Sequence, residues 1–292
     1  MKKNKPSNHH WWPKSLSQFW KNENGLIYMF SPDGEIKAVP PAQVALIRNG
    51  HNIKLSDLKG EETAFDCSFE SVFDNSDINF PMVVTELLKL ILKHEEGFRK
   101  LNISERFSDE FFCLVVECAI SLAVRSPRYR EKIKSIVELY RGTLSNNESK
   151  KYIALNMKGK HESIVQRIAK SAAICVLYDP KSRFIFGDGF YQNIPAIIPP
   201  LTTLKIVVPF TPAITVIVHS GKSRGYLGTN VININSSESE LCNSAIEIYS
   251  NNVIFSKSLN LNIDDFFKVN KFMEFNFLDD PMSNLIGKFF SE

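Results

Sequence analysis

The sequence predicts an α+β protein in which an N-terminal β-hairpin, a helical middle, and C-terminal strands with a helix form one compact unit. Short alternating runs flank a turn sequence near the N-terminus, apolar residues recur at helical spacing over about 61–177, and β-branched and aromatic runs follow. The chain has 292 residues, of which 43% are hydrophobic, so it can bury a large core. We expect a single domain over 1–292, with a hairpin segment over 1–60, a helical part over 61–178 and a β-rich part over 179–292.

The hairpin is expected between the runs 25–30 and 35–39, because Ser31-Pro-Asp-Gly between them is a turn sequence. Apolar residues over 83–92 predict an amphipathic helix that ends near Gly97. A second stripe covers 111–122, and Pro127 predicts a kink or a new helix start after Ser126. A third helix continues to about Gly142.

The polar run 144–151 is the best linker candidate. Helical spacing returns over 164–175, and strands are expected over 183–186, 204–208 and 213–218. Ser237 and Glu240 have the spacing of a capping box, which predicts a helix through Ile248. Short strand-like runs and a phenylalanine-rich tail over 266–277 close the chain.

Composition and charge limit the class of protein. The formal charge of +3 excludes a histone-like polycation and an acidic tail, but it leaves room for a local basic patch. The five cysteines form no CxxC pair, so neither a disulfide framework nor a zinc knuckle is indicated. The basic N-terminus is not followed by an apolar run, and the longest apolar stretch, 111–124, is too short to span a bilayer. We therefore expect a cytoplasmic protein without a membrane partner.

The segment His9-His10-Trp11-Trp12-Pro13 is the densest group of functional residue types. Neighbouring side chains point in different directions on a helix or a strand, so the two imidazoles cannot easily serve one site as equals. One histidine would act as an acid, base or ligand while the other orients it or packs. In the structural interpretation, which stays open, the tryptophans anchor the N-terminal segment by burying large rings.

Three arginines, Arg125, Arg128 and Arg130, surround the expected helix break at Pro127. A guanidinium group can fork onto a phosphate, and a helix N-terminus at the same place would add N–H donors. The alternative is a solvated basic turn that forms ion pairs.

Asp188 follows an apolar run and lies between Gly187 and Gly189. A carboxylate at the end of a strand suits a catalytic or metal-binding role, although aspartate is also a common turn residue. The remaining histidines are isolated in sequence and are expected at the surface or as satisfied core residues; they are His51, His94, His161 and His219. No P-loop, GxGxxG, GxSxG or HExxH pattern occurs, so the common NTPase, dinucleotide-binding, hydrolase and zincin interpretations lack support.

Several of these segments together resemble a bacterial family catalogued as domain of unknown function number 4238. The resemblance begins with the order His-His-x-x-Pro-x-x-Leu-x-x-Phe and the strand that follows it. It continues with Arg125-Ser-Pro after a long helix, Asp188 in a turn after a strand, Val208-Pro-Phe-Thr-Pro before a strand, and a helix ending over 243–250. The chain departs from the family at Gly187 and at Gly189-Phe190, where the family has Ser and Asn-Pro.

The resemblance implies a role among antiphage defence genes and nominates His10, with His9, Arg125 and Asp188 as one site. The first hypothesis is thus a defence effector that is a nuclease or another phosphodiester-directed enzyme. His10 would be the general acid or base, Arg125 would neutralise the phosphate, and Asp188 would orient the imidazole or bind a divalent cation such as Mg²⁺ or Mn²⁺.

Three further side chains would bind the nucleic acid substrate in this hypothesis. Trp11 and Trp12 would stack on unpaired bases, and Arg128 would contact phosphate. A nucleotide-consuming hydrolase differs only in its substrate. The second hypothesis is a sensing or binding module without chemistry, which recognises a phage protein or a partner defence protein, because no strong catalytic motif is present.

Overall fold

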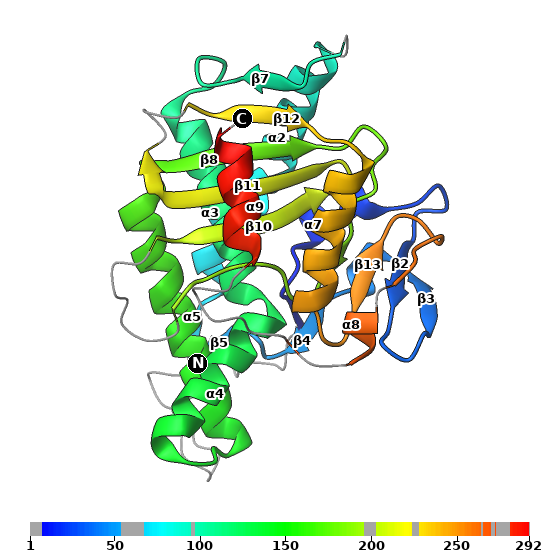
Figure 1. Cartoon of the computed structure of the whole chain (residues 1–292). Coiled ribbons are helices and arrows are strands. Elements are labelled where there is room, and N and C mark those ends of the chain that lie inside the picture. The colour runs from blue at the N-terminus through cyan, green and yellow to red at the C-terminus, as the bar shows by residue number, and fades with distance from the viewer. Residues whose placement is uncertain are drawn as a thin grey trace.

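Two larger β-sheets and the helices around them form the fold in the computed structural model of the chain (Figure 1). The structure describes residues 8–53, 67–94, 97–195, 203–223, 228–263, 265–269, 272 and 281–291. The α+β class and the N-terminal hairpin predicted from the sequence are confirmed.

The larger sheet has five strands in the order β10-β11-β8-β12-β7. These strands are β7 (Lys100–Asn102), β8 (Ala172–Tyr178), β10 (Lys205–Thr211), β11 (Ile214–Ser223) and β12 (Asn230–Asn233). All neighbours are antiparallel except β8 and β12, which run parallel. The central strand β8 is buried over six of its seven residues, as its continuous apolar sequence requires.

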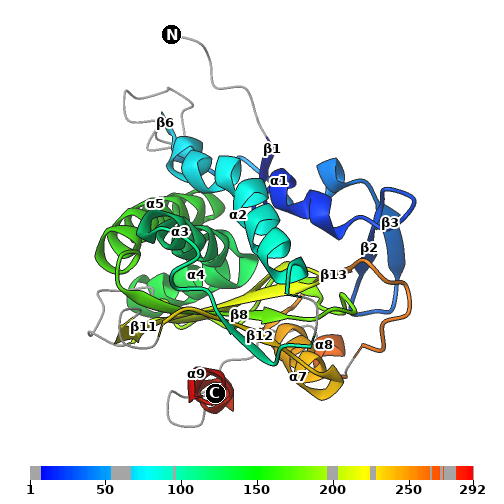
Figure 2. The ribbon, with the colours of Figure 1, turned by 90° about the horizontal axis from the view of Figure 1, so that it is seen from above.

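Helices cover both faces of this sheet (Figure 2). On one face lie α2 (Asp74–Leu92), α3 (Asp109–Arg125) and α5 (Asn146–Ile168), and α4 (Pro127–Arg141) follows α3 directly. On the other face lie α7 (Ser236–Tyr249) and α9 (Pro281–Ser291). Helix α3 packs on β8, β10 and β11 and is apolar on nearly every side, so it forms the centre of the core.

The smaller sheet has the strand order β3-β2-β13-β9. Its strands are β2 (Ile27–Phe30), β3 (Ile36–Val39), β9 (Phe186–Gly187) and β13 (Ile254–Ser256). Strands β2 and β3 are the predicted hairpin, and Gly34 in its turn has a φ of +86°, a conformation that favours glycine. Since β13 pairs with β2, the C-terminal part of the chain completes a sheet that the N-terminal part begins.

Short elements complete the description. Two small pairs are β1 (Asn8–His10) with β4 (Leu46–Arg48), and β5 (Asn52–Ile53) with β6 (Cys67–Ser68). The short helices are α1 (Lys14–Ser17), η1 (Gln18–Trp20), η2 (Pro41–Gln43), η3 (Glu70–Phe73) and α8 (Asp265–Lys268). Among the described helices, none has the length and apolar character needed to cross a membrane.

The predicted break between two helices is confirmed at Ser126. Its backbone is extended (ψ 143°), which is the conformation favoured for a residue before proline, and α4 begins at Pro127. The Ser126 hydroxyl accepts a hydrogen bond from the Tyr129 N–H and so caps α4.

Some predicted elements are wrong. The run 144–151 is not a linker, because Ser145 and Glu148 form a reciprocal capping box and α5 begins at Asn146. The helical spacing over 164–175 ends at Ile168, and the residues from Ala172 form strand β8, where packing on both faces favours an apolar strand.

Other boundaries are shifted. Helix α7 is capped by Asn235 with Glu238, two residues before the predicted pair. The strand expected over 183–186 is reduced to β9, and part of the phenylalanine-rich tail lies outside the described residues.

Candidate functional site

His10 is the last residue of β1 and lies partly exposed beside α1 and α2. Its Nδ1 lies 3.1 Å from the carbonyl oxygen of Val44. A carbonyl oxygen only accepts, so this bond assigns the proton of the neutral ring to Nδ1 and leaves a lone pair on Nε2. Within the described part of the chain, Nε2 has no hydrogen-bond partner. His10 therefore presents a nitrogen base that is fixed in orientation.

The surroundings of His10 keep this base neutral. Burial lowers the pKa of His10 below its usual value, and the positive charges of Lys14 and Arg125 lower it further. The Val44 hydrogen bond and the charge of Asp77 oppose this shift. A neutral imidazole at pH 7 is the form that accepts a proton.

Asp77 is the carboxylate of this site, and the sequence interpretation missed it. It lies in the first turn of α2, and the Ser15 hydroxyl donates to its backbone carbonyl oxygen over 2.8 Å, which ties α1 to α2. Its side chain is 35% exposed, so it faces both solvent and the interior. An acidic residue in the first turn of a helix is common, so nothing in the sequence marks Asp77 as special.

Arg125 is the partner of Asp77. Its two terminal nitrogens donate to the two carboxylate oxygens over 3.1 and 2.6 Å, its Nε donates to the Ser121 carbonyl, and its guanidinium group lies 4.5 Å from the centre of the Phe73 ring. The Arg125 side chain is only 1% exposed. The prediction that Arg125 touches a substrate phosphate is therefore wrong: the group is buried and already forked on a carboxylate.

A row of buried imidazoles lies behind His10. The His9 Nε2 is 3.4 Å from a Glu70 carboxylate oxygen, its Nδ1 faces the backbone N–H of His51, and the rings of His9 and His51 are 5.0 Å apart. His161 contacts the other side of Phe73 at 5.0 Å. His9 is 2% exposed, so it packs and orients this region, and its predicted role as a second catalytic group is not supported by its position.

His51 and His161 were expected to be satisfied if they lay in the core, and that expectation is wrong. Among the described residues, neither ring nitrogen of His51 nor the Nε2 of His161 has a hydrogen-bond partner, and all three atoms are buried. Burial, together with the nearby positive charge of Arg125, lowers the pKa of His51 to about 2 and that of His161 to about 4. Burial and the Arg125 charge also lower the pKa of Arg130 to about 10. Buried titratable groups with strongly shifted pKa values are found at functional sites more often than elsewhere.

Asp188 is buried, and none of the hydrogen bonds that its carboxylate forms within the described residues goes to His10, Asp77 or Arg125. Its carboxylate oxygens accept hydrogen bonds from the backbone N–H groups of Asn251 and Asn252 and from the Asn252 side chain over 2.8 to 3.0 Å. Burial raises the pKa of Asp188, and these hydrogen bonds oppose the shift. The carboxylate thus holds the turn between α7 and β13. The prediction that it orients His10 is wrong, because its oxygens are committed to that turn.

The glycines beside Asp188 lie at a close approach of two segments of the chain. A Cβ on Gly189 would overlap the backbone carbonyl of Tyr249, and one on Gly187 would overlap the Ser250 hydroxyl. The strand end and the turn after α7 therefore approach more closely than side chains would allow.

The three predicted substrate-binding residues are also buried. Trp12 is fully buried and stacks on Phe186 at 4.5 Å, and Trp11 stacks on the same ring at 6.0 Å. Arg128 is 7% exposed, lies 4.3 Å from the centre of the Tyr249 ring and donates to the Phe190 carbonyl. Stacking of Trp11 or Trp12 on a base and contact of Arg128 with phosphate are therefore excluded in this structure, and the structural interpretation of the tryptophans is correct.

No described group of three or more His, Cys, Asp or Glu side chains is arranged to hold a metal ion. The chain matches no family model, no curated protein and no solved structure. The resemblance to the family of unknown function therefore stays a prediction based on the motifs quoted above.

Proposed function

We propose that the protein is a cytoplasmic antiphage defence effector that hydrolyses phosphodiester bonds in a nucleic acid or nucleotide, with His10 as the general base. The observation that carries this proposal is the unpaired Nε2 of His10 on a partly exposed, neutral ring whose other nitrogen is held by Val44. A base with a fixed orientation and a lowered pKa suits activation of water near pH 7.

The neighbouring charges have complementary roles in the proposed step. His10 Nε2 takes a proton from water, the water oxygen bonds to phosphorus, and the ester oxygen leaves with a proton from solvent. The imidazolium formed in this step is stabilised by the exposed side of Asp77, which Arg125 holds in place. Lys14 is exposed beside His10 and would bind the phosphate in place of the buried Arg125.

The test is hydrolysis of RNA, DNA and nucleotides by purified wild type and His10→Gln, with and without Mg²⁺ or Mn²⁺. Loss of a general base typically slows a reaction about 10²- to 10⁴-fold, and we expect that loss for His10→Gln. His94→Gln is the matched control, because His94 is also a partly exposed histidine whose Nδ1 lies 2.9 Å from a backbone carbonyl, that of Leu90. It should keep full activity. Inertness of the wild type toward every substrate would count against the proposal.

A sensing or binding module without chemistry is the second candidate. It is favoured by the structural roles of Arg125, Asp188 and Trp12, which leave His10 without the partners that the sequence suggested. In this case His10→Gln should lower the melting temperature more than it changes protection of cells against phage. A variant with an unchanged melting temperature and no protection would exclude this candidate.

A further inference from the structure

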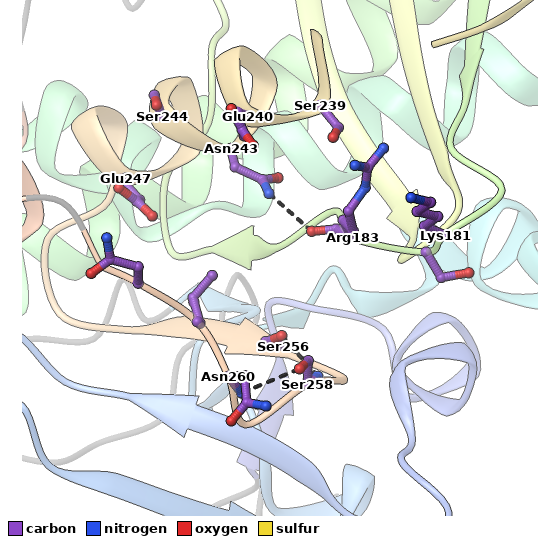
Figure 3. A pocket seen from close by; sticks show the side chains of 13 residues that line it. Lys181, Arg183, Ser239, Glu240, Asn243, Ser244, Glu247, Ser256, Ser258 and Asn260 are labelled. Carbon is purple, nitrogen blue, oxygen red and sulfur yellow. Dashed lines mark hydrogen bonds between the residues drawn. The ribbon is translucent and has the colours of Figure 1, made fainter. Parts of the chain in front are cut away.

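A polar pocket of about 520 Å³ is lined in part by α7, one of the helices on the face of the larger sheet opposite α2, α3 and α5, and none of its lining residues belongs to the site around His10 (Figure 3). Three segments build it: the turn 181–183 after β8, one face of α7, and the chain from Ser256 to Asn262 at the end of β13. Figure 3 shows the side chains of Glu240, Asn243, Ser244 and Glu247 along α7, opposite those of Ser256, Ser258 and Asn260. The pocket therefore has facing walls rather than a single exposed surface.

The pocket has a rigid frame. Arg183 donates to both carboxylate oxygens of the fully buried Asp179, over 2.8 and 2.9 Å, and also to the Ser236 hydroxyl. The Asn243 side chain donates to the Arg183 carbonyl over 2.9 Å and accepts from the Ile185 N–H. These bonds fix the turn 181–183 against α7, so the pocket is formed before any ligand binds.

The chemistry of the walls narrows the class of ligand. The lining contains two cations and two carboxylates, so neither a polyanion nor a polycation is favoured. Leu261 is the single apolar lining residue, and the lining contains no aromatic ring, which disfavours an apolar ligand or a nucleobase. The remaining lining groups are hydroxyls and amides, which both donate and accept hydrogen bonds.

Two of the charged groups are available to a ligand. Within the described residues, the side chains of Glu240 and Lys181 form no hydrogen bond or ion pair, and both residues are exposed at the pocket; only the backbone N–H of Lys181 is bonded, to Asp179. A carboxylate accepts from two adjacent hydroxyl groups, and an ammonium group donates to hydroxyl oxygens. This combination of groups matches a neutral molecule with several neighbouring hydroxyls.

We propose that this pocket binds a neutral polyhydroxylated ligand, a sugar or the sugar part of a larger molecule, through Glu240, Ser244 and Lys181. The proposal does not depend on the activity of His10, because the two sites share no residue.

The test is titration of the ¹⁵N-labelled full chain with glucose, ribose and N-acetylglucosamine, followed by NMR. We expect saturable shifts for the amides of α7 and of residues 181–183 with at least one of these sugars. The double variant Glu240→Ala/Ser244→Ala should bind it about tenfold more weakly or worse, since each lost hydrogen bond contributes about 1 kcal/mol. Glu138→Ala, at a partly exposed glutamate on α4, is the control and should leave the affinity unchanged.

Two outcomes would overturn the proposal. One is that none of the sugars gives saturable shifts at these residues while the amide spectrum is that of a folded chain. The other is that the double variant binds as tightly as the wild type.

Discussion

At the scale of single residues, the central feature is the contrast between His10 and the histidines behind it. His10 has one nitrogen fixed by a backbone carbonyl, and its other nitrogen meets no partner in the part of the chain that the structure describes; His51 and His161 carry buried nitrogens that likewise find no partner there. Buried imidazoles beside Arg125 stay neutral because a proton there would be both desolvated and repelled. Burying these imidazoles therefore reduces the stability of the fold, and one of them, His51, lies close to His10, the proposed base.

This arrangement predicts a loss of stability in mild acid. The unfolded chain protonates His51 and His161 near pH 6.5, but their folded-state pKa values are about 2 and about 4. Below pH 6.5 the unfolded state therefore binds more protons, and the free energy of unfolding falls with falling pH. Each histidine contributes up to about 1.4 kcal/mol per pH unit, down to about pH 4 for His161 and lower for His51.

Urea unfolding at pH 7 and pH 5 measures this effect. His161→Gln should lose about half of the pH dependence due to the two histidines. Equal pH dependence in the wild type and His161→Gln would show that His161 is protonated in the folded chain.

At the scale of elements, the contact between the turn 187–189 and the end of α7 brings together segments distant in sequence. Asp188 accepts hydrogen bonds from residues 251 and 252, and its backbone N–H donates to the Val253 carbonyl. The Arg128 N–H at the start of α4 donates to the Asp188 carbonyl. Asp188 thus joins α4, β9 and β13 and has a positioning role in the fold.

Two glycine substitutions test this close approach. Gly189→Ala places a Cβ on the Tyr249 carbonyl, so it should prevent folding or destabilise the chain by several kcal/mol, roughly the largest loss seen for single substitutions. Gly159→Ala is the control, because a Cβ at this position in α5 meets no atom within 4 Å. It should raise the free energy of unfolding by about 0.5–1 kcal/mol. A folded Gly189→Ala variant with wild-type stability would contradict the contact.

The secondary-structure elements also show which features of the fold can be predicted from local sequence patterns. The hairpin around Gly34 and the break at Ser126 follow from turn and proline chemistry, which acts locally, so both were predictable. Strand β8 was not, because an apolar run buried on both faces has no period that separates strand from helix. The capping box at Ser145 was predictable from its spacing, but its polar residues suggested a linker.

The residues of the candidate site were predicted only in part, because a local sequence pattern does not show how the chain packs in three dimensions. A histidine in a motif is visible in a sequence, whereas burial is decided by the tertiary fold. The interior positions of Arg125 and Trp12 and the role of Asp77 depend on how α2 and α3 pack, so residue types alone could not give them.

At the scale of the whole molecule, each large sheet combines strands from distant parts of the chain. Strand β13 pairs with β2 and β9, and β8 pairs with β11 and β12. Each of the two larger sheets therefore takes strands from two of the three segments expected from the sequence (the hairpin, helical and β-rich segments). Neither sheet is formed within a single segment. A single domain over 1–292 stays a prediction, which this interleaving favours.

A single cooperative unfolding transition is the expected consequence. Trp11 and Trp12 pack on Phe255 of β13 in the smaller sheet, and the Trp20 indole N–H donates to the Phe210 carbonyl of β10 in the larger sheet. Tryptophan fluorescence therefore reports on the region between the smaller sheet and β10. Far-ultraviolet circular dichroism reports mainly on the helices. The two signals should give the same urea midpoint. Separate midpoints would show that the two sheets unfold independently.

Histidine modification with diethyl pyrocarbonate, followed by mass spectrometry and an activity assay on the same samples, tests the role of His10 most directly. The reagent acylates accessible neutral imidazole nitrogens. We expect His10 and His94 to react in the folded chain, His9, His51 and His161 to be protected, and phosphodiester hydrolysis to disappear in step with modification of His10, in the wild type and in His94→Gln alike. An unreactive His10, or hydrolysis that survives its complete modification, would contradict the account.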